Sequence, residues 1–406
     1  MPTLVRALVK PELLVWARES ARLSVEQAAQ KAQVRPPSRL AAWERGESQP
    51  TIGQLRKLGR VYKRPLAVFY LAQAPKTFQA MQDFRRLPEG MAGVQSPELA
   101  FEVRRARYRR EIALDLYEEL FGAARAFTAT ASLDEDPEGV GVRMRELLGV
   151  GRDEPTRWRS SHEALNRWRS VVEKLGVLVF QASDVEVGEV RGFSISQTPL
   201  PVVVVNLKDV PLARVFTMLH EATHLMLREG GLCDLDEEQA SPAHRRMEVF
   251  CNHVAGAAMI PKDWLLEEDE VRKQRGAEWP DEVIAALAHR YRASREVVIR
   301  RLLILGRTSE AFYRKKREEL QAEFEAHRQE ELRKKALGLA SKGFVTPDRM
   351  AVSTAGPFFV RLVLNSYHQE KITSNDLASF LEVRLKHVPK IERAVFQRSV
   401  AAGAPA

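Results

Sequence analysis

The pattern of hydrophobic and polar positions divides the chain into helical stretches that flank a short region of strands. Residues 212–229 keep an apolar, helix-compatible pattern without Pro or Gly, and residues 247–261 show a second apolar helical pattern, which ends at a proline. Between residues 171 and 205, β-branched and aromatic runs of strand length predict a small sheet beside these helices. The positions assigned to strands are Val171, Val172, Val177, Leu178, Val179, Phe180, Ile195 and Val202–Val205.

From Pro11 to Leu71 the pattern predicts four short helices separated by tight turns. Leu23-Ser24 offers a start for the second helix, residues 33–36 form a proline-terminated turn, and Gly46 ends the third helix. Pro50-Thr51 opens the fourth. The apolar positions expected in the core between them are Leu13, Leu14, Ala17, Ala28, Ala29, Ala32, Leu40, Trp43, Ile52, Leu55 and Leu58.

The remaining regions are mostly helical in pattern. Arginines at 104–110 are followed at once by acidic residues, so we interpret this run as a solvated face, and Ala131–Gly141 as a flexible break. Residues 281–306 carry a core stripe at helical spacing, and Thr373-Ser374 opens a helix in the C-terminal tail. The expected fold class is mainly α and multidomain: a domain of short helices at 8–72, a helical connection at 73–160, an α+β domain at 161–306, a charged helix at 307–340 and a helical module at 341–406.

Composition favours a cytoplasmic protein without a disulfide scaffold. The 406 residues are too many for one ordinary core, and only Cys233 and Cys251 are present. We identify no secretory or membrane segment. Residues 1–75 hold 13 Lys and Arg against 5 Asp and Glu, an excess of 8 out of the net charge of +9. Such a local field favours polyanions and indicates nucleic acid, although basic surfaces are also often only solvated faces.

The residues most suggestive of chemistry are 220–224, which read His-Glu-Ala-Thr-His. Positions i and i+4 share one face of a helix, so His220 and His224 can offer two imidazole nitrogens to one metal ion. Glu221 then lies beside that ion, where its carboxylate can take a proton from metal-bound water whose pKa Zn²⁺ lowers to roughly 7. The alternative is a buried helix with two core histidines, because short motifs also arise by chance.

A catalytic zinc site needs a third protein ligand and an open fourth position. Glu248 is a strong candidate, because it opens a helical pattern that would pack beside the first helix. Asn252, one turn later, shares its face and is expected to steady the carboxylate or a neighbouring backbone group. The other candidates are Cys233, Asp234, Asp236, Glu237, Glu238, His244, Cys251 and His253.

Several segments resemble the ImmA/IrrE metallopeptidases in order and spacing over about 130 residues: Gly176–Val179, Val190–Ser194, Pro201–Asn206, Ala213–Leu225 and Glu248–Pro261. This resemblance implies a zincin-like domain with a thermolysin-like zinc site formed by His220, His224 and Glu248, in which Glu221 is the base. The chain departs from the family pattern at Ala222, usually Leu, and at Thr223, usually Gly. Both departures spare the ligands, but Thr223 adds bulk near the site.

The N-terminal pattern resembles the XRE family of Cro-like and phage-repressor-like helix-turn-helix domains, most clearly in Leu23–Ala29, Trp43–Gly46 and Pro50-Thr51. In this motif the second helix enters the major groove, and its first residues contact base edges. Only one of them, an arginine, can make a strong bidentate contact with guanine. A protein-docking module on the same scaffold therefore stays open as an alternative. The residues expected at the DNA surface are Pro37, Ser38, Arg39 and Ala42.

Members of the resembled peptidase family cleave helix-turn-helix repressors and so relieve repression in stress responses or mobile elements. The two resemblances together imply a zinc-dependent metalloendopeptidase fused to a DNA-binding domain. Its expected partners are a helix-turn-helix repressor or antitoxin as protein substrate and double-stranded DNA, without a membrane. Two alternative functions stay open: a transcriptional regulator whose zinc domain is a sensor or scaffold, and an antitoxin-like partner of a toxin. The oligomeric state also stays open, with a homodimer of the chain as one alternative.

Overall fold

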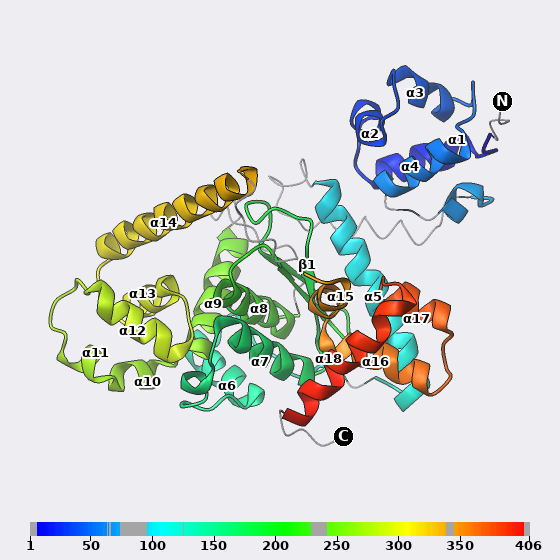
Figure 1. The fold of residues 1–406 in the computed structure, drawn as a ribbon. Coiled ribbons are helices and arrows are strands. Elements are labelled where there is room, and N and C mark those ends of the chain that lie inside the picture. The colour runs from blue at the N-terminus through cyan, green and yellow to red at the C-terminus, as the bar shows by residue number, and fades with distance from the viewer. Residues whose placement is uncertain are drawn as a thin grey trace. The chain divides into compact units, whose positions relative to one another are not determined.

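The computed structural model forms two compact units, Met1–Arg107 and Tyr108–Ala406 (Figure 1). The chain is mainly α-helical, and the strands that the structure describes form one three-stranded sheet in the second unit. The predicted mainly α, multidomain fold class is therefore confirmed. The residues described are 6–62, 64, 66–73, 96–124, 126–228, 242–337 and 345–401.

The first unit contains the predicted short helices. Ser24 caps the second helix, because its side chain accepts a hydrogen bond from the Gln27 N–H while the Gln27 side chain accepts one from the Ser24 N–H. Arg18 pairs with Glu44 at 2.9 Å and ties the first helix to the third. The helices are α1 Pro11–Ser20, α2 Val25–Ala32, α3 Ser38–Glu44 and α4 Ile52–Tyr62, followed by a 3₁₀ turn at Leu66–Tyr70.

In the second unit, the sheet has the order β1-β3-β2, with β1 Leu178–Ala182 parallel and β2 Gly192–Ile195 antiparallel to the central β3 Val202–Asn206. The three strands are buried along their whole length, as expected where both faces of a sheet are covered. Helix α8 Pro211–Met226 packs against β2 and β3, and it also contacts α7 Ser161–Lys174 and α9 Pro242–Met259.

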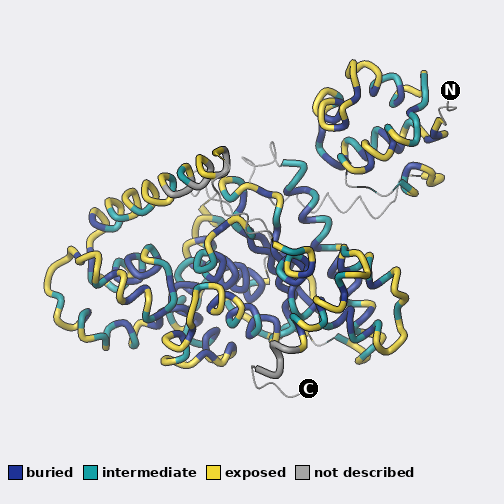
Figure 2. Tube along the Cα trace, in the orientation of Figure 1, coloured by how far each residue is buried: buried dark blue, intermediate teal, exposed yellow. Residues whose placement is uncertain are grey.

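The other helices surround this centre. Figure 2 shows that α8 is mostly buried, whereas the charged helix α14 is mostly exposed. These helices are α5 Pro97–Phe121, α6 Pro137–Leu148, α10 Lys262–Glu267, α11 Asp269–Lys273, α12 Asp281–Tyr291, α13 Arg295–Ile304, α14 Glu310–Ala336, α15 Pro347–Ala355, α16 Pro357–His368, α17 Ser374–Phe380 and α18 Val388–Ala401, with 3₁₀ turns at Pro155–Arg157 and Leu385–His387.

Two predictions of secondary structure were wrong. Val171 and Val172 belong to α7 and not to a strand, because that helix starts at the Ser160 cap and continues to Lys174 with both valines on its buried face. The expected flexible break at Ala131–Gly141 becomes helical from Pro137 onward, because the Asp136 side chain accepts hydrogen bonds from two N–H groups of the first turn of α6.

The arginine run on α5 is not a solvated face where it enters the second unit. Arg109 is 2% exposed and donates to the Thr354 carbonyl, and Arg110 is 9% exposed. The Arg110 guanidinium donates to the carbonyl groups of Gln197, Pro199 and Leu200 at 2.8–3.0 Å. The prediction failed here because acceptors on distant segments hold these two side chains inside the unit.

Candidate metal centre and helix-turn-helix surface

Helix α8 carries the predicted motif in its last two turns. Its apolar residues face α7, α9 and the sheet, so the polar side chains of the motif are held inside the unit. His220 is 3% exposed, His224 is 5% exposed and Glu221 is 0% exposed. The two Nε2 atoms lie 3.0 Å apart, as the i, i+4 spacing predicted.

Helix α9 brings Glu248 to the same point. One carboxylate oxygen of Glu248 lies 3.2 Å from His220 Nε2, and the other lies 3.2 Å from His224 Nε2. Burial acts to raise the pKa of Glu248, but the hydrogen bonds and charges of the two histidines outweigh burial and hold this pKa well below its usual range. The structure therefore gathers two imidazole nitrogens and an ionised carboxylate in a space that α8 and α9 enclose.

Asn252 holds one of these imidazoles in orientation. Its Oδ1 lies 3.0 Å from His220 Nδ1 and can accept a hydrogen bond from Nδ1–H, while Nε2 of the same ring faces Glu248. The sequence placed Asn252 one turn after Glu248 and predicted that it would steady the carboxylate or a backbone group. In the structure its Oδ1 contacts the ring of His220.

The other candidate ligands that the structure describes are Cys251, His244 and His253. Cys251 is buried, and its Sγ lies within 4.8 Å of the ligand nitrogens of both histidines. Burial, and then the charges of Glu248 and Glu221, raise the pKa of this thiol well above its ordinary value. His244 Nε2 lies 3.6 Å from Glu248, whereas His253 turns away and pairs with Glu138 at 3.1 Å. The candidates that lie outside the described residues are Cys233, Asp234, Asp236, Glu237 and Glu238.

Glu248 and Cys251 both lie near the two histidines: one oxygen of Glu248 is 3.2 Å from each Nε2, and the Cys251 Sγ is within 4.8 Å of both ligand nitrogens. The charge states of the two side chains favour Glu248 as the third ligand. A carboxylate held in its charged form is ready to bind a cation, but a thiol with a raised pKa must first lose its proton.

A close approach of β2 to α8 sets the surroundings of Glu221. A Cβ built on Gly192 would lie 2.5 Å from Thr217 Cγ2, 2.8 Å from the Val204 carbonyl oxygen and 3.5 Å from Glu221 Cγ. Only glycine fits at this position, so Gly192 lets the start of β2 lie directly against the motif helix. Gly192 was expected only as part of the segment Val190–Ser194, although an isolated glycine in a strand pattern signals a close backbone approach.

Thr223, the main departure from the family pattern, is also buried. Its hydroxyl donates to the Leu219 carbonyl at 2.9 Å, one turn back on the same helix. This bond turns the hydroxyl to the helix backbone and satisfies a polar group that would otherwise be costly to bury.

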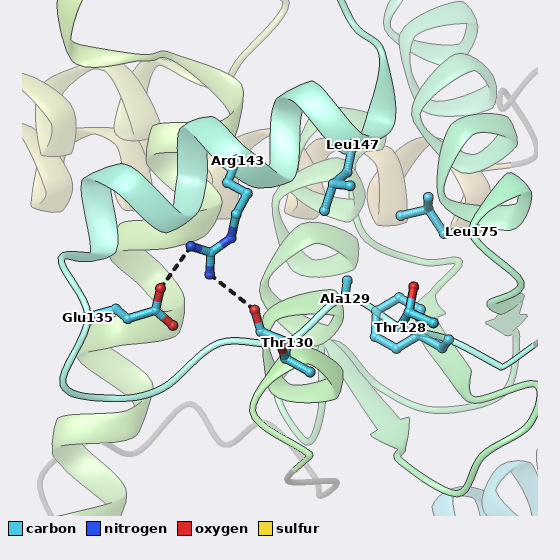
Figure 3. A pocket seen from close by; sticks show the side chains of 8 residues that line it. Thr128, Ala129, Thr130, Glu135, Arg143, Leu147 and Leu175 are labelled. Carbon is cyan, nitrogen blue, oxygen red and sulfur yellow. Dashed lines mark hydrogen bonds and ion pairs between the residues drawn. The ribbon is translucent and has the colours of Figure 1, made fainter.

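The second unit also has a cavity of about 420 Å³ that is separate from these residues (Figure 3). Arg143 bonds to Glu135 at 2.8 Å and to the Thr130 carbonyl at 3.1 Å along its side. His220, Glu221, His224 and Glu248 are not among the described residues that line it, so its volume says nothing about the candidate metal centre. The lining residues are Phe127, Thr128, Ala129, Thr130, Glu135, Arg143, Leu147 and Leu175.

In the first unit, the predicted DNA-contacting residues lie at the start of α3. Pro37, Ser38 and Arg39 are exposed and Ala42 is half-buried. The Arg39 guanidinium lies 5.8 Å from the centre of the Trp43 ring on the same helix. The structure thus presents Arg39 at the surface, where a base edge could meet it.

Two family models match the chain in the order that the sequence predicted. Residues 14–69 match the helix-turn-helix model, and residues 172–303 match the model of the IrrE N-terminal-like peptidase domain. The chain therefore joins a helix-turn-helix of the DNA-binding type to an ImmA/IrrE-like domain, and both resemblances are confirmed. The search of curated proteins finds no match. Among the helices described, none has both the length and the apolar character that crossing a bilayer requires.

Proposed function

We propose that the chain is a cytoplasmic zinc-dependent metalloendopeptidase that a DNA-binding helix-turn-helix directs to its target. The substrate class that we propose is a helix-turn-helix repressor or antitoxin, whose cleavage relieves repression in a stress response or mobile element. The observation that carries this proposal is the meeting of His220, His224 and Glu248 within 3.2 Å beside the buried Glu221.

The residues present fit a zinc ion. Two neutral imidazoles and one carboxylate are a typical donor set of catalytic zinc sites, which keep a fourth position open. Asn252 fixes the orientation of His220, as hydrogen-bond partners of metal-binding histidines usually do. His220, His224 and Glu248 would hold the ion, and bound zinc would polarise the peptide carbonyl and activate a water molecule.

Glu221 would move the proton in this scheme. It is adjacent to His220 in sequence and turned toward the sheet, where Gly192 leaves room for it. A carboxylate in this position can accept a proton from the attacking water and pass it to the amine of the leaving peptide. The exclusion of bulk water from the buried site strengthens these electrostatic interactions.

Strand β2 offers a means of holding the substrate. It is an edge of the sheet and, in the part of the chain described, pairs only with β3. The opposite edge, β1, is packed against α15. Because the residues of β2 are buried, an extended peptide would have to displace the groups that cover this edge, and its backbone would then lie next to Gly192 and Glu221 in a common mode of peptide recognition.

The helix-turn-helix would bring the peptidase to a promoter or to a repressor bound there. The exposed Pro37, Ser38 and Arg39, with the half-buried Ala42, would meet the major groove, and the basic excess of residues 1–75 would attract the phosphates. A chain with these two parts would act on proteins near its operator.

The decisive experiment compares wild type with Glu221→Gln during co-expression with candidate helix-turn-helix repressors. This substitution keeps the size of the side chain but removes its basicity, so cleavage should fall roughly 100- to 10,000-fold while zinc stays bound. His224→Ala should lose both zinc and cleavage, and Glu146→Gln on the exposed face of α6 should lose neither. If Glu221→Gln relieves repression as well as wild type, the chain is a regulator with a zinc-binding scaffold.

A further inference from the structure

The C-terminal end of α15 inserts against the sheet of the peptidase unit. Gln181 on β1 donates its Nε2 hydrogens to the Ser353 carbonyl at 2.7 Å and to the Ser353 hydroxyl at 3.0 Å. Arg169 on α7 donates to the same carbonyl at 2.8 Å. Gln181 is 5% exposed and Arg169 is 4% exposed. The C-terminal helices therefore reach two buried polar side chains of the domain that carries the candidate metal centre.

The same Gln181 also contacts the motif helix. Its Oε1 accepts a hydrogen bond from Arg214 on α8, which is 5% exposed. Arg214, Thr217 and Glu221 follow one another at spacings of three and four, so they share one face of α8. Thr217 and Glu221 approach Gly192 at the start of β2. Gln181 thus joins α15 to the face of α8 that rests on the sheet and carries Glu221.

Gly356, just after α15, allows this part of the chain to pack closely against β1 and Arg169. Its φ is +85°, and a Cβ built on it would lie 2.6 Å from the Val179 carbonyl oxygen and 2.7 Å from Arg169 Nη2. In the next helix, the Phe359 ring meets Phe180 of β1 edge-on, with ring centres 5.9 Å apart. A side chain at position 356 would have to lift α15 away from β1 and from Gln181.

We propose that the C-terminal helices position α8 through Ser353, Gln181 and Arg214, and that Gln181 is a positioning residue for the metal centre. The hydrogen bonds hold the first turn of α8 at Arg214, six residues before His220, and the register of α8 on the sheet sets where His220, Glu221 and His224 meet Glu248. The consequence for zinc affinity rests on the proposed function, whereas the consequence for the order of α8 does not.

The test uses the full chain in three variants. Gly356→Ala should move α15 away from β1. Gln181→Met removes the Nε2 donor and the Oε1 acceptor but keeps the approximate size of the side chain. Gly306→Ala is the matched control, because Gly306 has a similar φ of +66° but a Cβ there would meet nothing within 4 Å. Amide hydrogen exchange of peptides from 211–226 is measured in zinc-free protein, and zinc affinity is measured by competition with a chelator.

We expect exchange in α8 to accelerate at least about tenfold in Gly356→Ala and Gln181→Met, with exchange in α12 and α13 unchanged. Zinc affinity should fall about 10- to 100-fold, as for other residues that orient metal ligands. Gly306→Ala should change neither quantity. If Gly356→Ala does not fold, Gln181→Met decides the question alone.

Folded variants with wild-type exchange in α8 and zinc affinity within twofold of wild type would overturn the inference while the proposed zinc site stands. A wild-type chain that binds no zinc, but whose α8 loosens in the variants, would instead overturn the proposed function and leave the positioning of α8 in place. A uniform acceleration over the whole second unit would show that the contact serves only global stability, which also rejects the inference.

Discussion

The candidate metal centre and the helix-turn-helix keep their charged side chains in opposite environments. His220, Glu221, His224 and Glu248 are at most 5% exposed, whereas Arg39 stands at the surface of α3. A buried charge is costly unless partners compensate it, so the groups of the centre depend on one another. An exposed charge is stabilised by water until a polyanion arrives. Zinc binding and stability in the first region should therefore depend on the neighbouring side chains and on pH. DNA binding by the second region should depend on salt concentration and base sequence.

The largest effect should follow the removal of a candidate ligand from the buried region. Glu248→Ala should weaken zinc binding by more than about 100-fold, because even residues that only orient a ligand typically contribute 10- to 100-fold. Zinc per chain, measured by elemental analysis after chelator competition, checks this expectation. Cys251→Ser is the control and should keep most of the metal. Full zinc in Glu248→Ala together with loss in Cys251→Ser would assign the third ligand to the cysteine.

The next effect concerns the buried Glu173, which should make the free energy of unfolding depend on pH. Burial raises the pKa of Glu173 to about 7 from its ordinary value of 4.5, although Arg169 lies 3.4 Å away and opposes this shift. Because the folded chain holds the proton more tightly than the unfolded chain, the stability that Glu173 contributes is present below about pH 4.5. This contribution is lost as the pH rises through 7, and its loss costs about 3 kcal/mol.

Glu173→Gln should remove this dependence. Denaturant unfolding of zinc-free protein at pH 5 and pH 8 gives the change in unfolding free energy, and the variant should lose less stability than wild type across this range. Glu146→Gln, at an exposed position, should behave like wild type. An identical pH profile for wild type and Glu173→Gln would mean that Arg169 keeps the carboxylate ionised throughout.

A smaller effect is expected at the residue that orients His220. Asn252→Ala leaves the three candidate ligands in place but removes the acceptor 3.0 Å from His220 Nδ1, so zinc affinity should fall about 10- to 100-fold. His253→Gln is a close control, because His253 is the next residue but pairs with Glu138. Equal zinc affinities in the two variants would remove Asn252 from the proposed centre.

Local patterns were sufficient to predict much of the fold and the candidate centre. The capping residue Ser24, the glycine that ends α3 and the i, i+4 histidines all act through neighbours within one or two helical turns, so the sequence records them directly. Glu248 was identified because the predicted helical pattern over 247–261 begins beside it, although the helix α9 itself begins at Pro242. Its role as a ligand is still a prediction, but the structure brings it to both histidines.

The features that the sequence did not reveal depend on partners far along the chain. Arg109 and Arg110 looked solvated because acidic residues follow them, yet their acceptors lie 245 and 90 positions away. Gly356 and Gly192 resemble ordinary glycines until the backbone opposite them is known. Burial of a charged or small residue by a distant segment leaves no local periodicity, so only the tertiary structure shows it.

The smallest effect should appear in the exposed region, where Arg39 is the one predicted contact that can distinguish bases strongly. Arg39→Ala in the full chain should cost about 1–3 kcal/mol on the preferred duplex and less on unrelated duplexes, because the lost bond is to a base edge. Arg60→Ala, an exposed arginine on α4, is the control and should lower affinity for all duplexes alike or not at all. Binding titrations at two salt concentrations separate these contributions, since phosphate contacts set the salt dependence. An equal loss on every duplex for Arg39→Ala would make it a phosphate contact, and wild-type binding would place the DNA elsewhere on the helix-turn-helix.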